Sequence, residues 1–171
     1  MEENTGFMQD FRLPRYHEIP NVGLYLEQTT RYIAECFAPL LDGVITASMI
    51  SNYVKRGLVS NPVKKQYSRE QIAYLIYITT VKTVLSMEDI RLMLRIQKET
   101  YETQVAYDYF CTALEEMLAC ISQNRQGPDV DAGAESSEKT MLRNTIVAVA
   151  HTICLRKQFA LLQQEEQAKT E

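Results

Sequence analysis

The segment from Ser68 to about Leu85 is apolar on nearly every side of a helix, and this feature constrains the fold most. Ser68 and Gln71 form a capping box that begins the helix. The apolar side chains that surround its axis are Ile72, Leu75, Ile76, Tyr77 and Ile78. A helix of this kind is stable in water only when other elements cover it. The sequence therefore predicts a mainly α-helical domain with this helix at its centre.

Capping and stop signals predict further helices on both sides of the central one. The predicted helices cover residues 24–41 (disturbed near Pro39), 46–56, 68–85, about 103–122 and about 139–163, with another beginning after Ser86. Thr46 or Ser48 is the expected N-cap of the second helix, and Gly57 is expected in the left-handed conformation that ends it. Five or more helices in 171 residues predict a compact helical chain.

A small β-hairpin is predicted between Leu58 and Tyr67, with its turn at residues 60–62. This hairpin lies within the basic part of the chain. Residues 43–82 hold six basic side chains and one acidic one, whereas the segments on both sides are acidic and the net charge is −4. No acidic residue occurs between Gly43 and Tyr67. A cationic segment in an acidic chain predicts a surface for an anionic partner.

Metal and catalytic sites are not predicted. The cysteines and histidines are far apart along the chain: Cys36, Cys111, Cys120, Cys154, His17 and His151. No pair has the spacing of a zinc ligand set, so we expect reduced cysteines that act as small buried apolar residues. A glycine-rich phosphate loop and the groupings typical of nucleophilic catalysis are both missing. We therefore expect a protein that is not an enzyme and has no cofactor.

The apolar runs are too short to predict a membrane span. The longest candidate, TIVAVAHTIC (145–154), falls well below the ~18–20 residues that a spanning helix needs. The first 18 residues are acidic and lack an apolar stretch, so they do not read as a secretory signal. We expect a cytoplasmic protein without a membrane partner.

The order of elements from Val44 to Ile96 resembles the winged helix-turn-helix of the MerR-type transcription regulators. The matching stretches are TASMISNYVKRGLV (46–59), a basic hairpin ending at Tyr67, SREQIAYLIYI (68–78) and VLSMEDIRLMLRI (84–96). The whole chain also resembles an uncharacterised bacterial family, a domain of unknown function with predicted MerR-like DNA binding. The resemblance implies a MerR-like winged helix-turn-helix with a small hairpin wing, followed by long C-terminal helices. It also implies that Ile50, Tyr53, Leu58 and Tyr67 are core residues.

A DNA-binding role follows from the exposed residues that this pattern leaves on the 46–56 helix and the hairpin. A short helix fits the major groove, where the side chains of Ser48, Ser51 and Asn52 can address base edges. Asn52 can bond adenine through two atoms. Lys55, Arg56, Lys64 and Lys65 are expected to neutralise phosphates beside the groove. We therefore predict a sequence-specific transcriptional regulator that binds double-stranded DNA.

Simpler structural roles are open for the same residues. Lys64 and Lys65 also suit a solvated turn, Lys55 and Arg56 can offset a helix dipole, and Asn52 can face a partner helix. MerR-type helices usually carry arginine or tyrosine where this chain has Ser48, Ser51 and Asn52. This difference favours weaker DNA binding or a different DNA sequence. It also favours an alternative function, that of a protein-interaction adaptor that has kept the fold.

The predicted organisation has five parts. They are an N-terminal arm (1–20), the winged helix-turn-helix domain (21–101), a helix that is a candidate for dimerisation (102–122), a flexible linker (123–138) and a C-terminal helix with a tail (139–171). The arm carries Arg12 and Arg15, which could reach a minor groove or pack on the chain itself. The long helices could seal an intramolecular bundle or form a dimer seam. We expect a homodimer, because the resembling group pairs a long helix antiparallel with its twin.

Overall fold

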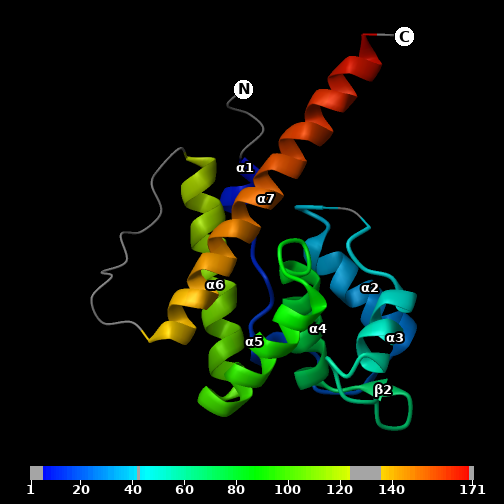
Figure 1. Ribbon diagram of the computed structural model, residues 1–171. Helices are drawn as coiled ribbons and strands as arrows, with labels where there is room; N and C mark the ends of the chain where they lie inside the picture. Colours follow the sequence, from blue (N-terminus) through cyan, green and yellow to red (C-terminus); the bar gives the residue numbers. More distant parts are fainter. Residues whose placement is uncertain (1–5, 42, 124–135, 170–171) are drawn as a thin grey trace.

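The computed structural model describes residues 6–41, 43–123 and 136–169, and the predicted mainly α-helical architecture is confirmed (Figure 1). The order is α1 (Gly6–Gln9), the 3₁₀ helix η2 (Tyr16–Glu18), β1 (Leu24–Tyr25), α2 (Leu26–Phe37), α3 (Ala47–Lys55), β2 (Gln66–Tyr67), α4 (Arg69–Val81), α5 (Met87–Thr100), α6 (Thr103–Ser122) and α7 (Ser137–Ala168). In the described residues the two strands form one antiparallel sheet.

Helix α4 is the buried centre, as its all-round apolar sequence predicts. Ile72, Leu75 and Ile78 have no exposed surface. The predicted capping box is present: Ser68 Oγ accepts from Gln71 N at 3.3 Å, and Gln71 Oε1 accepts from Ser68 N at 2.8 Å. The helix ends at Val81, four residues before the predicted end. Helices α2, α6 and α7 all pack on α4, which explains why it carries so little polar surface.

The first predicted helix is shorter than expected at both ends. Leu24 and Tyr25 form β1, which pairs with β2 in the register Leu24–Tyr67 and Tyr25–Gln66. Gly23, just before β1, lies very close to β2: a Cβ at this position would be 2.7 Å from the Cβ of Gln66. The helix ends at Phe37, just before Pro39, which has no N–H to donate to a carbonyl of the preceding turn.

The turn predicted at residues 60–62 is wrong. The reverse turn lies three residues later, where Val63 N donates to Gln66 O at 3.1 Å and Gln66 N donates to Val63 O at 2.9 Å. The Gln71 side chain explains the difference, because its Nε2 donates to the carbonyl oxygens of Ser60 at 2.8 Å and Asn61 at 3.2 Å. These carbonyls bond to α4 instead of pairing across a hairpin. The strand that follows the turn finds its main partner in β1.

Helices α6 and α7 pack against each other within one chain (Figure 1). The buried residues of α6 include Phe110, Leu114 and Leu118, and those of α7 include Ile146, Val149 and Ile153. The α6 stripe that could have formed a dimer seam is therefore covered intramolecularly. Helix α7 continues to Ala168, five residues beyond the predicted end at about residue 163. Most of the predicted linker, residues 124–135, lies outside the described residues.

The described part of the predicted N-terminal arm is packed on α6. Leu13 and Ile19 have no exposed surface. Glu115 of α6 accepts from Leu13 N at 2.8 Å and from both terminal nitrogens of Arg15 at 2.7 and 2.6 Å. Arg12 pairs with Glu18 at 2.9 Å. These contacts give Arg15 a structural role and leave it unable to reach a minor groove.

Helix α7 requires one correction concerning membranes. An 18-residue window in it has a mean hydropathy of 1.3, so by length and composition this helix could cross a membrane. Its longest uninterrupted apolar run is shorter than a membrane span, which is why the sequence predicts none, but the average over the window is apolar. The helix packs on α6 through Ile146, Val149 and Ile153, and 28% of the window is buried.

Candidate nucleic-acid interface

Helix α3 presents one polar, solvent-facing side. The Thr46 side chain caps its start by accepting from Met49 N at 3.2 Å, which settles the choice between Thr46 and Ser48. Ile50 and Tyr53 are buried with at most 1% exposure, and they anchor the opposite side. The exposed residues fall at intervals of three and four, so they share one face: Ser48, Ser51, Asn52 and Lys55.

The C-terminal end of α3 is held by two arginines. Gly57 has the predicted left-handed φ of 72°, and Arg56 precedes it as the C-cap. Arg56 Nε donates to Asn52 Oδ1 at 3.4 Å, and Arg91 Nη2 of α5 donates to Arg56 O at 2.6 Å. The side-chain oxygen of Asn52 therefore already accepts a hydrogen bond from Arg56. A two-atom contact between Asn52 and adenine requires that this bond be broken. Arg91 is a cation beside α3 that sequence reasoning missed.

The reverse turn before β2 carries a lysine at each central position. Lys64 and Lys65 have φ values of 51° and 64°, the pattern of a type I′ turn, for which Asn-Gly is preferred. A left-handed conformation costs a residue with a side chain roughly 1–2 kcal/mol. Both lysines are exposed, and neither forms an ion pair with any residue that the structure describes. Two uncompensated charges thus lie at a turn whose backbone disfavours lysine.

The structure divides the cations of the basic segment into two groups. Lys82 turns inward, where Nζ donates to Val44 O, and burial, with a smaller effect from Arg156, lowers the pKa of Lys82. Arg69 Nε donates to Ile19 O at 2.8 Å. Both therefore hold the fold together. The exposed cations are the four that the sequence singled out: Lys55, Arg56, Lys64 and Lys65.

The helix and the turn lie at one end of the molecule. Both α3 and β2 pack against α2, and Figure 1 shows the loop before β2 at the same end as α3. All seven predicted contact residues are solvent-exposed, and we call them the α3–turn face: Ser48, Ser51, Asn52, Lys55, Arg56, Lys64 and Lys65. None of them is covered by α5, α6 or α7.

Metal-ligating groups do not gather in the described residues. No group of three or more His, Cys, Asp or Glu side chains could hold an ion there. Burial raises the pKa of the Cys36 and Cys111 thiols to about 12, so neither is a thiolate near neutral pH. All four cysteines are free thiols.

Comparison with known proteins gives one result. A family model described as "Domain of unknown function (DUF1836)" matches residues 14–110, from the end of the N-terminal arm to the middle of α6. The match includes the whole α3–turn face. No curated protein and no solved structure matches the chain significantly.

Proposed function

The chain belongs to the DUF1836 family, and we propose that it is a DNA-binding transcriptional regulator that reads duplex DNA with a MerR-like winged helix-turn-helix. In this proposal α2 and α3 are the helix-turn-helix pair and the Val63–Gln66 turn is the wing. Helix α3 enters the major groove with Ser48, Ser51 and Asn52 toward base edges. The protein acts by binding alone, in the cytoplasm, without a cofactor.

The turn formed by Lys64 and Lys65 is the observation that carries the proposal. Strained backbone persists where the surrounding structure enforces it, and it is concentrated at functional sites. Asparagine and glycine would satisfy this turn at lower cost, yet the chain has two lysines there with no described acidic partner. Phosphate neutralisation explains both the charge and its exposed position.

A selection experiment tests the function. Duplexes retained from a random library are expected to converge on one sequence. Replacing Ser48, Ser51 and Asn52 together with alanine should relax that preference, because base contacts specify, whereas removing Lys64 and Lys65 should weaken all duplexes alike. Gln158→Ala on α7 is the matched control and should change neither. A library with no enriched sequence would contradict sequence-specific recognition.

The adaptor function is the second candidate, and the serines on α3 favour it. Ser48 and Ser51 replace residue types that usually contact DNA in the resembling group, and the net charge of the chain is −4. An adaptor would be recovered from cells with one stoichiometric protein partner and without nucleic acid. Such a result, together with no enrichment in the selection, would favour the adaptor over the regulator.

We also propose that the regulator is a homodimer joined through the outer half of α7. Burial stops at Cys154, and beyond it the helix projects away from the body (Figure 1). Leu155, Phe159 and Leu162 are more than half exposed and follow each other at intervals of four and three, the spacing of a coiled-coil seam. A second helix packed along this seam would remove these apolar side chains from water, which is energetically favourable.

Charge favours a second, antiparallel copy as that partner. The basic pair at residues 156–157 and the acidic pair at residues 165–166 lie symmetrically about Leu161. An antiparallel arrangement centred there brings each basic pair opposite the acidic pair of the other copy. Sedimentation equilibrium should give twice the chain mass, and Phe159→Glu should give the single mass. Gln158→Glu, one residue away, should remain a dimer.

A further inference from the structure

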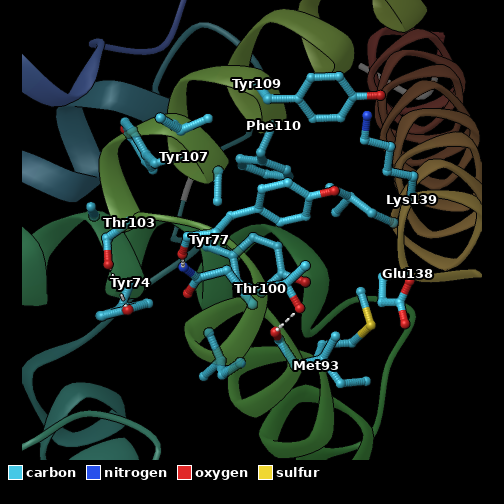
Figure 2. Close-up of a pocket in the computed structure, with 18 residues that line it drawn as sticks. Tyr74, Tyr77, Met93, Thr100, Thr103, Tyr107, Tyr109, Phe110, Glu138 and Lys139 are labelled. Atoms are coloured by element: carbon cyan, nitrogen blue, oxygen red, sulfur yellow. Dashed lines mark hydrogen bonds between the residues drawn. The ribbon is translucent and has the colours of Figure 1, made fainter. Parts of the chain in front are cut away.

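A pocket of about 210 Å³ lies among α4, α5, α6 and the start of α7, away from the α3–turn face. Its walls are almost entirely apolar and rich in aromatic rings (Figure 2). Tyr77 and Phe110 form an edge-to-face pair with ring centroids 5.0 Å apart. Met93 of α5, Ala106 of α6 and Leu142 of α7 complete the walls. Glu138 and Lys139 at the start of α7 are the charged residues of the lining. An ion would lose most of its hydration against the mainly apolar walls, so the pocket suits an uncharged molecule.

Two tyrosine hydroxyls at the pocket are already engaged. Tyr74 Oη lies 2.9 Å from Thr103 Oγ1, and the two hydroxyls share a hydrogen bond. Tyr107 Oη donates to Pro14 O at 2.8 Å. These groups support the walls and are not offered to a ligand.

The Tyr77 hydroxyl differs from them. Within the described part of the chain it has no hydrogen-bond partner, and Figure 2 shows its ring extended across the pocket from α4 toward α7. Gln97 also lines the pocket, but its Nε2 donates to Tyr101 O at 2.8 Å and its unpartnered Oε1 is sealed from solvent. Burial raises the pKa of Tyr77 to about 12, so the hydroxyl stays neutral at physiological pH. Tyr77 thus adds a neutral hydroxyl to a mainly apolar space, whose lining also includes Tyr101, Tyr109, Glu138 and Lys139.

The volume limits the size of the occupant. A dry apolar cavity of about 150 Å³ binds benzene. The pocket is somewhat larger, so it accommodates a flat molecule of one or two fused rings, whereas drug-sized ligands occupy roughly 300–1,000 Å³.

We propose that this pocket binds a small, uncharged aromatic molecule whose single polar group hydrogen-bonds to the hydroxyl of Tyr77. The rings of Tyr77 and Phe110 provide the apolar contact, and the hydroxyl selects among molecules of equal shape. The site is independent of the DNA-binding proposal, and its test uses no DNA.

Indole and benzothiophene are the probes, because they have nearly the same shape and only indole carries an N–H donor. Calorimetric titration of the full chain should give saturable indole binding with a submillimolar Kd, the range expected for so few atoms. Benzothiophene should bind about five-fold more weakly, which corresponds to one neutral hydrogen bond. Tyr77→Phe keeps the ring and should abolish this difference.

A second pair of variants tests the location. Ala106→Phe fills the pocket and should eliminate binding of both probes, whereas Ala119→Phe, on α6 outside the lining, should leave binding intact. Absence of saturable binding, equal affinities of the wild-type chain for the two probes, or binding that survives Ala106→Phe would each overturn the proposal.

Discussion

Arg91 of α5 donates from Nη2 to the carbonyl oxygen of Arg56, 2.6 Å away, and so joins α5 to the end of α3. The same guanidinium pairs with Glu88 at 2.7 Å. The carbonyls at a helix C-terminus lack intrahelical partners, and a cation there also complements the helix dipole. The side chain of Arg91 thereby fixes the orientation of the helix that carries Ser48, Ser51 and Asn52.

Arg91→Met should lower the free energy of unfolding by about 1 kcal/mol, because the bond is charged but solvent-exposed. It should weaken DNA binding more than Arg95→Met, since Arg95 is another exposed arginine of α5 without a bond to α3. Urea denaturation and fluorescence anisotropy measure the two effects. Equal DNA affinities of the two variants would refute the positioning role of Arg91.

The turn at Lys64 and Lys65 should be suboptimal for stability. Lys64→Asn with Lys65→Gly supplies residues that tolerate positive φ, so the free energy of unfolding should rise by about 1–2 kcal/mol. Lys64→Gln with Lys65→Gln removes the same charge without relieving the backbone and should bring no such gain. Chemical denaturation compares the two double variants. A destabilised Asn-Gly variant would mean that the turn is not strained by its lysines.

Glu115 should be important for docking the N-terminal segment. Its side chain is 16% exposed and accepts hydrogen bonds from Leu13 and Arg15. Glu115→Gln should reduce the free energy of unfolding by about 2 kcal/mol, because the Arg15 charge loses its partner. Glu116→Gln, the exposed neighbour, should change it by less than about 0.5 kcal/mol. If Glu115→Gln and Glu116→Gln lowered the free energy of unfolding equally, the Arg15–Glu115 ion pair would not be what docks the N-terminal segment.

The thiols of Cys36, which is half-buried, and Cys111, which is buried, should resist alkylation. Burial raises the pKa of Cys36 and Cys111 to about 12, so both stay protonated as the pH rises from about 7 to about 9. The thiolate fraction of an ordinary thiol, with a pKa of about 8.5, rises roughly 25-fold over the same range. Mass spectrometry after iodoacetamide treatment should find neither residue modified in the native protein at pH 9. Both should be modified in guanidinium. Rapid native labelling of Cys111 would contradict its burial.

The helices that begin with a side-chain cap could be predicted closely from sequence. Thr46, Ser68 and Ser86 each cap the helix that follows, because capping depends on residues only three positions apart. The buried faces followed from apolar spacing, and Ile50 and Tyr53 are core residues as predicted.

Long-range contacts could not be predicted in the same way. The pairing of Leu24 with Tyr67 and the bond from Arg91 to Arg56 join residues 35 or more positions apart, and no local signal reports them. The turn was misplaced because Ser60-Asn61-Pro62 has stronger turn residues than Lys64-Lys65. In the candidate site, residue type identified the exposed cations. Only the structure showed that Lys82 and Arg69 point into the fold.

The salt dependence of DNA binding tests the central claim most directly. Anisotropy titrations of a mixed-sequence duplex give the slope of log affinity against log salt for the wild-type chain and for Lys64→Asn/Lys65→Gly. Each lost phosphate contact should make the slope shallower by about 0.9, so the double variant should differ by about 1.8. Lys98→Asn with Lys169→Asn, which removes two charges outside the α3–turn face, should keep the wild-type slope. A slope unchanged by loss of Lys64 and Lys65, or binding that does not depend on salt, would contradict recognition of DNA by this face.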